Sequence, residues 1–127
     1  MTTGAGSFWR LEPHAPAQGS EICLLESIAV GAAVGRSWGP SRSAFRLIIY
    51  RGSSGARAFV NRCPHFSMPL DLEDGNFMSD DGQHLSCRRH FALFDPDNGR
   101  CIAGACAGSF LDAVPIQIDD QDILRVG

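Results

Sequence analysis

The chain has 127 residues, a net charge of −3 at pH 7 and a sequence pI of ≈ 5.7. This length suits one domain, and the acidic balance argues against a nucleic-acid partner, for which a basic face is expected. No apolar run reaches the ~20 residues of a membrane span, and the start lacks the basic flank and apolar stretch of a signal peptide. We therefore expect a cytoplasmic protein without a membrane partner.

The first part of the chain divides into an arm, a strand and a loop. Residues 1–19 are rich in Gly, Ala and Pro, and we expect an irregular arm whose Phe8-Trp9 pair packs on a single domain, residues 20–127. A strand is expected at 21–26. Residues 27–43 include four Gly or Pro residues and show little periodicity, which predicts a loop.

The rest of the chain reads as short β-strands. Residues 45–50 and 56–61 flank Arg-Gly-Ser-Ser-Gly, which predicts a hairpin. Further strands are expected at 84–86, 91–94, 100–103, 114–118 and 123–126. The Asp97-Asn98-Gly99 turn should pair two of them, and Pro115 favours the edge of a sheet. The pattern predicts an all-β fold, a small antiparallel β-sandwich or barrel.

Two Cys/His pairs are the strongest chemical signal in the sequence. Cys63-Pro64-His65 and Cys87-Arg88-Arg89-His90 form a C-x-H and a C-x-x-H motif, separated by residues 66–86. Thiolates are soft donors that hold iron, whereas a neutral imidazole is a borderline donor that carries no charge. Two thiolates and two imidazoles on paired loops suit an iron–sulfur centre in which His₂ replaces Cys₂ on one iron.

Two other interpretations of these motifs remain. Two Cys and two His are also a common structural zinc set, but zinc modules typically use C-x₂₋₄-C and H-x₃₋₅-H halves. The second alternative is a degenerate protein that keeps the fold of a cluster-binding protein and holds no cluster. The presence of all four candidate ligands argues against it.

The motifs and the residues after them resemble a known family. "CPHFSMPL" and "CRRHFALFDPDNGRCIAGACAG" are similar to the Rieske [2Fe–2S] proteins. The resemblance implies one [2Fe–2S] cluster, held by Cys63 and Cys87 on the buried iron and by His65 and His90 on the outer iron. It also implies a cluster-binding subdomain, about residues 60–108, inserted into the β-domain.

The resemblance also places the chain within the family. The high-potential branch has an extra Cys in each ligand loop and Ser and Tyr hydroxyls near the cluster. Met68 and Arg89 stand at the two Cys positions here, and Ala92 and Phe94 stand at the hydroxyl positions. Because these side chains cannot donate hydrogen bonds to sulfur, the chain resembles the low-potential, ferredoxin-type branch. Two usual glycines are also replaced, by Ser67 and Phe91.

The other three cysteines are Cys23, Cys101 and Cys106. We expect buried reduced thiols that behave as small hydrophobic residues, and we predict no disulfide between Cys101 and Cys106. Iron ligation by these cysteines is an alternative, but their spacing fits no standard ligand frame.

The resemblance implies a one-electron carrier with no catalytic site of its own, although enzymatic activity stays uncertain from sequence. Its expected partners are a flavin-containing reductase and a terminal oxygenase or similar acceptor, each bound transiently. An alternative is a redox-sensing or small regulatory subunit of a larger oxidoreductase, similar to the small subunit of nitrite reductases.

Overall fold

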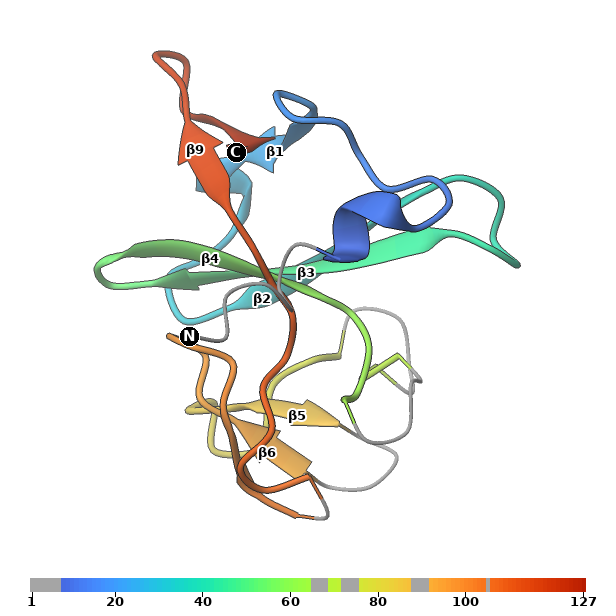
Figure 1. Cartoon of the computed structure of the whole chain (residues 1–127). Helices are drawn as coiled ribbons and strands as arrows, with labels where there is room; N and C mark the ends of the chain where they lie inside the picture. Colours follow the sequence, from blue (N-terminus) through green and yellow to red (C-terminus); the bar gives the residue numbers. More distant parts are fainter. Residues whose placement is uncertain (1–7, 65–68, 72–75, 88–91, 105) are drawn as a thin grey trace.

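A computed structural model of the chain describes residues 8–64, 69–71, 76–87, 92–104 and 106–127. These residues form ten strands in three sheets, with two short 3₁₀ helices (Figure 1). Every strand pairing among them is antiparallel. The prediction of an all-β, antiparallel fold is therefore confirmed. No helix in this part of the chain is long and apolar enough to cross a membrane.

The elements have the following bounds. The 3₁₀ helices are η1 (Phe8–Leu11) and η2 (Leu25–Ser27). The strands are β1 (Glu21–Leu24), β2 (Ala33–Trp38), β3 (Phe45–Gly52), β4 (Gly55–Val60), β5 (Leu85–Cys87), β6 (Ala92–Phe94), β7 (Cys101–Ala103), β8 (Ala113–Val114), β9 (Ile116–Ile118) and β10 (Ile123–Val126).

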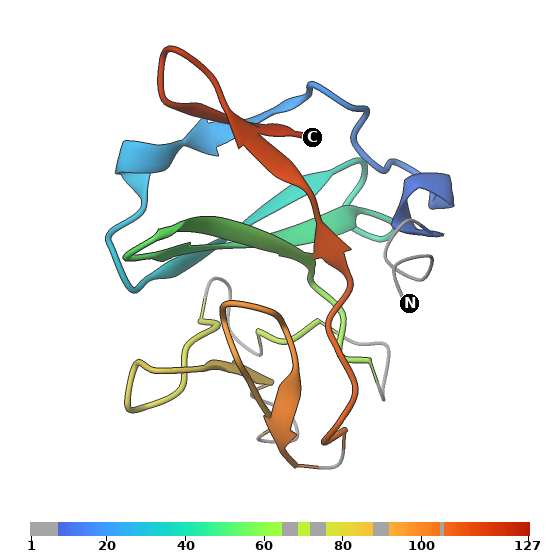
Figure 2. The same cartoon turned by 60° about the vertical axis from the view of Figure 1, so that its left-hand side comes forward.

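Two of the sheets form what we call the base. One has the strand order β2-β3-β4-β8 and the other β1-β10-β9, and they lie in separate layers (Figure 2). Buried side chains from both sheets share one hydrophobic core, which also contains Trp9 from the N-terminal arm at 0% exposure. The expectation that this tryptophan packs on the domain is confirmed.

The third sheet, β5-β6-β7, lies on one side of the four-stranded sheet, and the sheet β1-β10-β9 lies on the other side (Figure 2). This third sheet is the core of the cluster-binding subdomain. The chain enters it after β4 and leaves it before β8, so it is an insertion, as predicted. Alternate residues of β3 pack into the two cores on either side of its sheet, since successive side chains of a strand point to opposite faces. Leu47 and Ile49 pack into the core of the base, whereas Ile48 packs into the core of the subdomain.

The predicted loop at 27–43 is wrong, because it contains β2. This strand pairs with β3 at six positions, from Ala33 with Tyr50 to Trp38 with Phe45. Gly35 made the segment look irregular, yet it has a packing role. A Cβ at Gly35 would lie 3.1 Å from the ring of Phe77, which belongs to the subdomain core. The glycine lets the subdomain approach the base closely, as strand glycines often do.

The strands expected at 114–118 and at 21–26 also differ from the prediction. The strand expected at 114–118 is divided at Pro115 into β8, which pairs with β4, and β9, which pairs with β10. Each half is an edge strand of its own sheet, in keeping with the missing N–H of proline. The strand expected at 21–26 ends at Leu24, where η2 begins. The hairpin of β3 and β4 is confirmed, with Gly52 opposite Gly55.

Candidate metal centre

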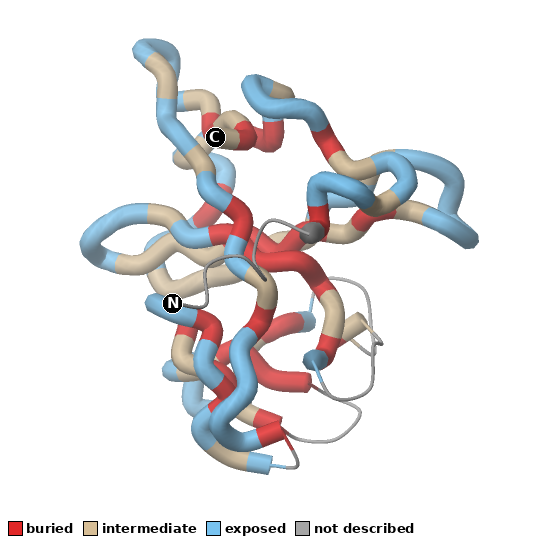
Figure 3. The backbone as a smooth tube through the Cα atoms, viewed as in Figure 1, coloured by how far each residue is buried: buried red, intermediate tan, exposed pale blue. Residues whose placement is uncertain are grey.

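The two predicted cysteine ligands lie together in the core of the cluster-binding subdomain. Cys63 follows β4 after two residues, and Cys87 is the last residue of β5. Both side chains are 0% exposed and belong to the same buried hydrophobic cluster. Figure 3 shows β5 as a buried segment below the central sheet. Thiolates are the soft ligands that bind iron in iron–sulfur clusters, and these two thiols are shielded from solvent. This part of the site therefore fits the expected [2Fe–2S] cluster.

The two predicted histidine ligands, His65 and His90, lie outside the described residues. Within the described ranges, no group of three or more His, Cys, Asp or Glu side chains could hold a metal ion. The structure therefore places two of the four predicted ligands, and the complete ligand set stays a prediction.

Cys87, the first residue of the second ligand motif, belongs to a pair of antiparallel strands. It pairs with Ala92 across β5 and β6. Ala92 and Phe94 are 1% and 0% exposed and belong to the same hydrophobic cluster as the two cysteines. Neither side chain has a hydrogen-bond donor, so a hydroxyl cannot reach the site from these two positions.

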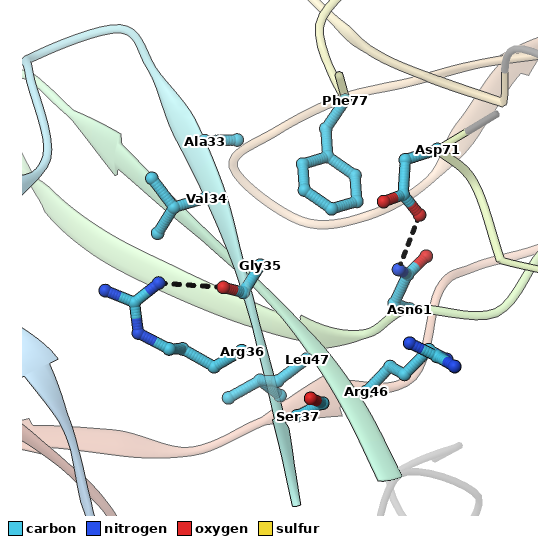
Figure 4. Close-up of a pocket in the computed structure, with 10 residues that line it drawn as sticks. All are labelled: Ala33, Val34, Gly35, Arg36, Ser37, Arg46, Leu47, Asn61, Asp71 and Phe77. Atoms are coloured by element: carbon cyan, nitrogen blue, oxygen red, sulfur yellow. Dashed lines mark hydrogen bonds between the residues drawn. The ribbon is translucent and has the colours of Figure 1, made fainter. Parts of the chain in front are cut away.

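Asn61 joins the two ends of the first ligand loop. Its Nδ2 donates to Oδ1 of Asp71 at 2.9 Å (Figure 4), and the backbone N–H of Leu70 donates to its Oδ1 at 2.7 Å. The side chain is buried, with 7% exposure, so these hydrogen bonds replace contacts with water. Asn61 therefore fixes the distance between the strand that precedes Cys63 and the segment that follows the loop.

Arg62 connects the same loop to the N-terminal arm. Its guanidinium forms a two-pronged contact with the carboxylate of Glu12, in which Nη1 lies 3.0 Å from Oε1 and Nη2 contacts Oε2. Asp112 lies 3.7 Å from Nη2. The hydrogen bond to Glu12 is the main cause that raises the pKa of Arg62, with burial acting in the opposite direction. The arm thus holds the residue directly before Cys63.

Cys101 and Cys106 add two more sulfur atoms to this core. Their Sγ atoms lie 2.8 Å apart, and their side chains are 1% and 2% exposed. Burial is the largest cause that raises the pKa of Cys106 to about 12, followed by its hydrogen bond to Cys101 and by interactions with Cys63. No disulfide links any of the five cysteines, all of which lie among the described residues. The prediction of buried thiols at Cys23, Cys101 and Cys106 is confirmed.

Two pockets border the first ligand loop. The larger one, ≈ 630 Å³, lies where β2 and β3 meet the segment that contains Asp71 and Phe77 (Figure 4). The smaller one, ≈ 170 Å³, reaches Cys63 itself and is lined by Pro64 and Phe110 among others. Phe110 is 54% exposed, so an apolar ring lies at the surface beside the ligand loop.

Sequence reasoning missed two features of this site, which are the Asn61 bridge and the Arg62 contact with the arm. Asn61 and Arg62 stand next to the first motif, but adjacency gives no sign of what their side chains contact.

Comparisons with known proteins agree with this architecture. The sequence profile described as "Rieske [2Fe-2S] domain" matches residues 21–116. No curated protein matches the chain. Among solved structures, the ferredoxin of carbazole 1,9a-dioxygenase from Nocardioides aromaticivorans IC177 has a TM-score of 0.62 and 19% identity, covering 87% of this chain and 98% of that one.

Two further structures are similar to this chain. The Sphingomonas yanoikuyae B1 ferredoxin has a TM-score of 0.62 and 20% identity, over 86% of this chain and 98% of that one. The terminal oxygenase of carbazole 1,9a-dioxygenase from Novosphingobium sp. KA1 has a TM-score of 0.63 and 16% identity, but only 30% of that chain is covered. At these identities the likeness shows a shared fold.

Proposed function

Because the chain belongs to the Rieske [2Fe–2S] domain family, we propose that it is a one-electron carrier that passes electrons from a flavin-containing reductase to a terminal oxygenase or a similar enzyme. Its cofactor is one [2Fe–2S] cluster, which supplies reversible one-electron redox chemistry. The observation that carries the proposal is the family match over residues 21–116, together with the burial of both motif cysteines in one core.

The four motif residues would hold the cluster. Cys63 and Cys87 would bind the inner iron from within the core, where their 0% exposure keeps water away from the thiolates. His65 and His90 would bind the outer iron through one ring nitrogen each. The other ring nitrogen then carries a proton that becomes more acidic on oxidation, so that the potential falls with pH in the alkaline range.

The similarity to ferredoxins supports a carrier. The chain covers 98% of two ferredoxin chains and 30% of an oxygenase chain. One similar structure is a complex of reduced oxygenase and oxidized ferredoxin in carbazole 1,9a-dioxygenase. We propose an analogous, transient complex in the cytoplasm, with Pro64 and Phe110 supplying part of the apolar contact.

An EPR spectrum of the dithionite-reduced protein tests the cluster assignment, with iron and sulfide assayed on the same anaerobic sample. A rhombic signal whose average g lies below that of all-cysteine clusters is expected for mixed Cys/His ligation. The matched variants His65→Cys and His90→Cys should abolish this signal or shift it towards the all-cysteine type. A colourless sample that contains zinc, or one that stays metal-free after reconstitution with iron and sulfide, would contradict the proposal.

Kinetics with partner proteins then separate a carrier from a redox sensor. A carrier should be reduced by a flavin reductase and reoxidised by an oxygenase within one turnover, and its complexes should dissociate in both redox states. A stable complex whose affinity changes with the redox state of the cluster would instead favour a regulatory subunit.

A further inference from the structure

A carboxylate of the N-terminal arm meets the arginine that precedes the first predicted ligand. The guanidinium of Arg62 makes a two-pronged contact with the carboxylate of Glu12, and Oδ2 of Asp112 lies 3.7 Å from its Nη2. These side chains are between 31% and 37% exposed, so each is mostly removed from water. They come from segments that are distant in sequence, which are the arm, the segment after β4 and the segment before β8.

Glu12 is held in place independently of Arg62. Its backbone N–H donates to the carbonyl of Trp9 at 3.1 Å, and the indole of Trp9 is fully buried in the core of the base. The guanidinium of Arg10 lies 4.4 Å from the centre of that indole and donates to the carbonyl oxygen of Gly127 at 3.0 Å. Because these contacts fix the arm, its carboxylate reaches Arg62 without the ordering of a free segment of chain.

Arg62 also belongs to the surroundings of the predicted cluster ligand. It directly precedes Cys63, and both residues line the smaller pocket, of ≈ 170 Å³. A positive charge in this position favours the reduced cluster, because reduction adds one negative charge. The field of a guanidinium that is paired with Glu12 is weaker than that of a free one, since the carboxylate offsets its charge.

We propose that Glu12 is a positioning residue for the cluster. It holds the guanidinium of Arg62 beside Cys63 and offsets its charge, and so keeps the reduction potential of the cluster lower than a free arginine would. This inference rests on the proposed function, in which Cys63 binds the [2Fe–2S] cluster. Neither Glu12 nor Arg62 is a ligand in that proposal, so both can be replaced without removal of a metal–ligand bond.

A role through charge and a role through loop shape predict different signs. Glu12→Gln leaves the charge of Arg62 less compensated, which should favour the reduced state. Arg62→Gln leaves Glu12 and Asp112 as two negative charges without their cation, which should favour the oxidised state. If the pair only held the loop in shape, either substitution would break the same contact and would shift the potential in the same direction.

The test compares reduction potentials of the cluster-loaded proteins, measured by spectroelectrochemical titration at low ionic strength. We expect each single substitution to change the one-electron reduction equilibrium about threefold, as for a partly exposed ion pair, equal to about 28 mV. Glu12→Gln should shift it towards reduction and Arg62→Gln towards oxidation. Glu12→Asp keeps the negative charge and should lie closer to the wild type than Glu12→Gln does. The control variants Glu21→Gln and Arg42→Gln remove exposed charges elsewhere and should match the wild type.

The salt dependence of the potential gives a second readout. Both shifts should shrink as the ionic strength rises, because salt screens partly exposed charges. Equal potentials in wild type and Glu12→Gln, or shifts of the same sign in Glu12→Gln and Arg62→Gln, would overturn the inference while the cluster itself remains. A wild type without the rhombic EPR signal would instead overturn the proposed function, and this inference with it.

Discussion

In the base, β3 pairs with β2 and with β4 at six positions each, whereas each strand of the cluster-binding subdomain is three residues long. The two cores differ as well. The core of the base is built from aliphatic and aromatic side chains with one cysteine, whereas the described core of the subdomain includes Cys63, Cys87, Cys101 and Cys106. An isolated two-stranded hairpin is marginal in water, and a small three-stranded sheet depends on the packing of its hydrophobic face. We therefore expect the base to fold on its own contacts and the subdomain to depend on its cofactor as well.

Removal of the cluster should give the largest effect and tests this difference directly. In a Cys63→Ser/Cys87→Ser variant, the free energy of local opening should fall towards zero for the amides of β5–β7, because ligand binding no longer supports their fold. Amides of β3 and β4 should keep their protection. Hydrogen exchange followed by mass spectrometry measures both regions in one sample.

The matched control is a Cys23→Ser variant, which changes a buried thiol in the base and leaves the proposed ligands in place. It should leave the protection of β5–β7 unchanged. If β3 and β4 of the cluster-free variant exchanged as fast as β5–β7, the base would depend on the cofactor too, and the comparison would fail.

Asn61 lies at the boundary between the two regions, so its replacement sharpens the comparison. Asn61→Ala leaves the buried N–H of Leu70 without its acceptor and removes the contact with Asp71. Losing a buried hydrogen-bond partner costs about 1–3 kcal/mol. We expect this loss to appear as faster release of iron to a chelator and as a lower unfolding midpoint of the subdomain.

Asn76 provides the control for this variant, because it is exposed. Asn76→Ala should release iron at the wild-type rate. An Asn61→Ala protein that also retained the wild-type rate would show that the first ligand loop keeps its shape without the bridge.

The two regions also differ in how far the sequence predicted them. The β3–β4 hairpin was predicted well because a Gly-rich turn separates two apolar runs. β2 was missed because Gly35 serves the packing of Phe77, a contact between segments distant in sequence. Local sequence patterns do not encode such contacts, and tertiary packing overrides the local preferences of the residues involved.

The site shows the same division. Cys63 and Cys87 could be identified from their motifs, since ligand spacing is a local property. The bond between Asn61 and Asp71 depends on how the segment after the first ligand loop returns to the end of β4, and local sequence patterns do not indicate it.

The smallest expected effect belongs to the base, at the turn between β9 and β10. Asp119 accepts hydrogen bonds from Nε of Arg125 at 2.8 Å and from the backbone N–H of Gln121 and Ile123 at 2.8 and 3.0 Å. The bond from Arg125 is the main cause that lowers the pKa of Asp119. Asp120 follows it in the turn, with an exposed side chain.

A carboxyl with a lowered pKa in the folded state stabilises the fold above its unfolded-state pKa, and this contribution is lost as the pH falls through the folded-state value. Asp119→Asn should therefore lower the thermal midpoint slightly at neutral pH, and the difference from wild type should shrink as the solution is acidified below about pH 4. Asp120→Asn should show no such convergence. Because Asp119 belongs to the base, this shift in thermal midpoint should appear equally in proteins with and without the cluster. A shift seen only in the cluster-loaded protein would mean that the two regions unfold as one unit.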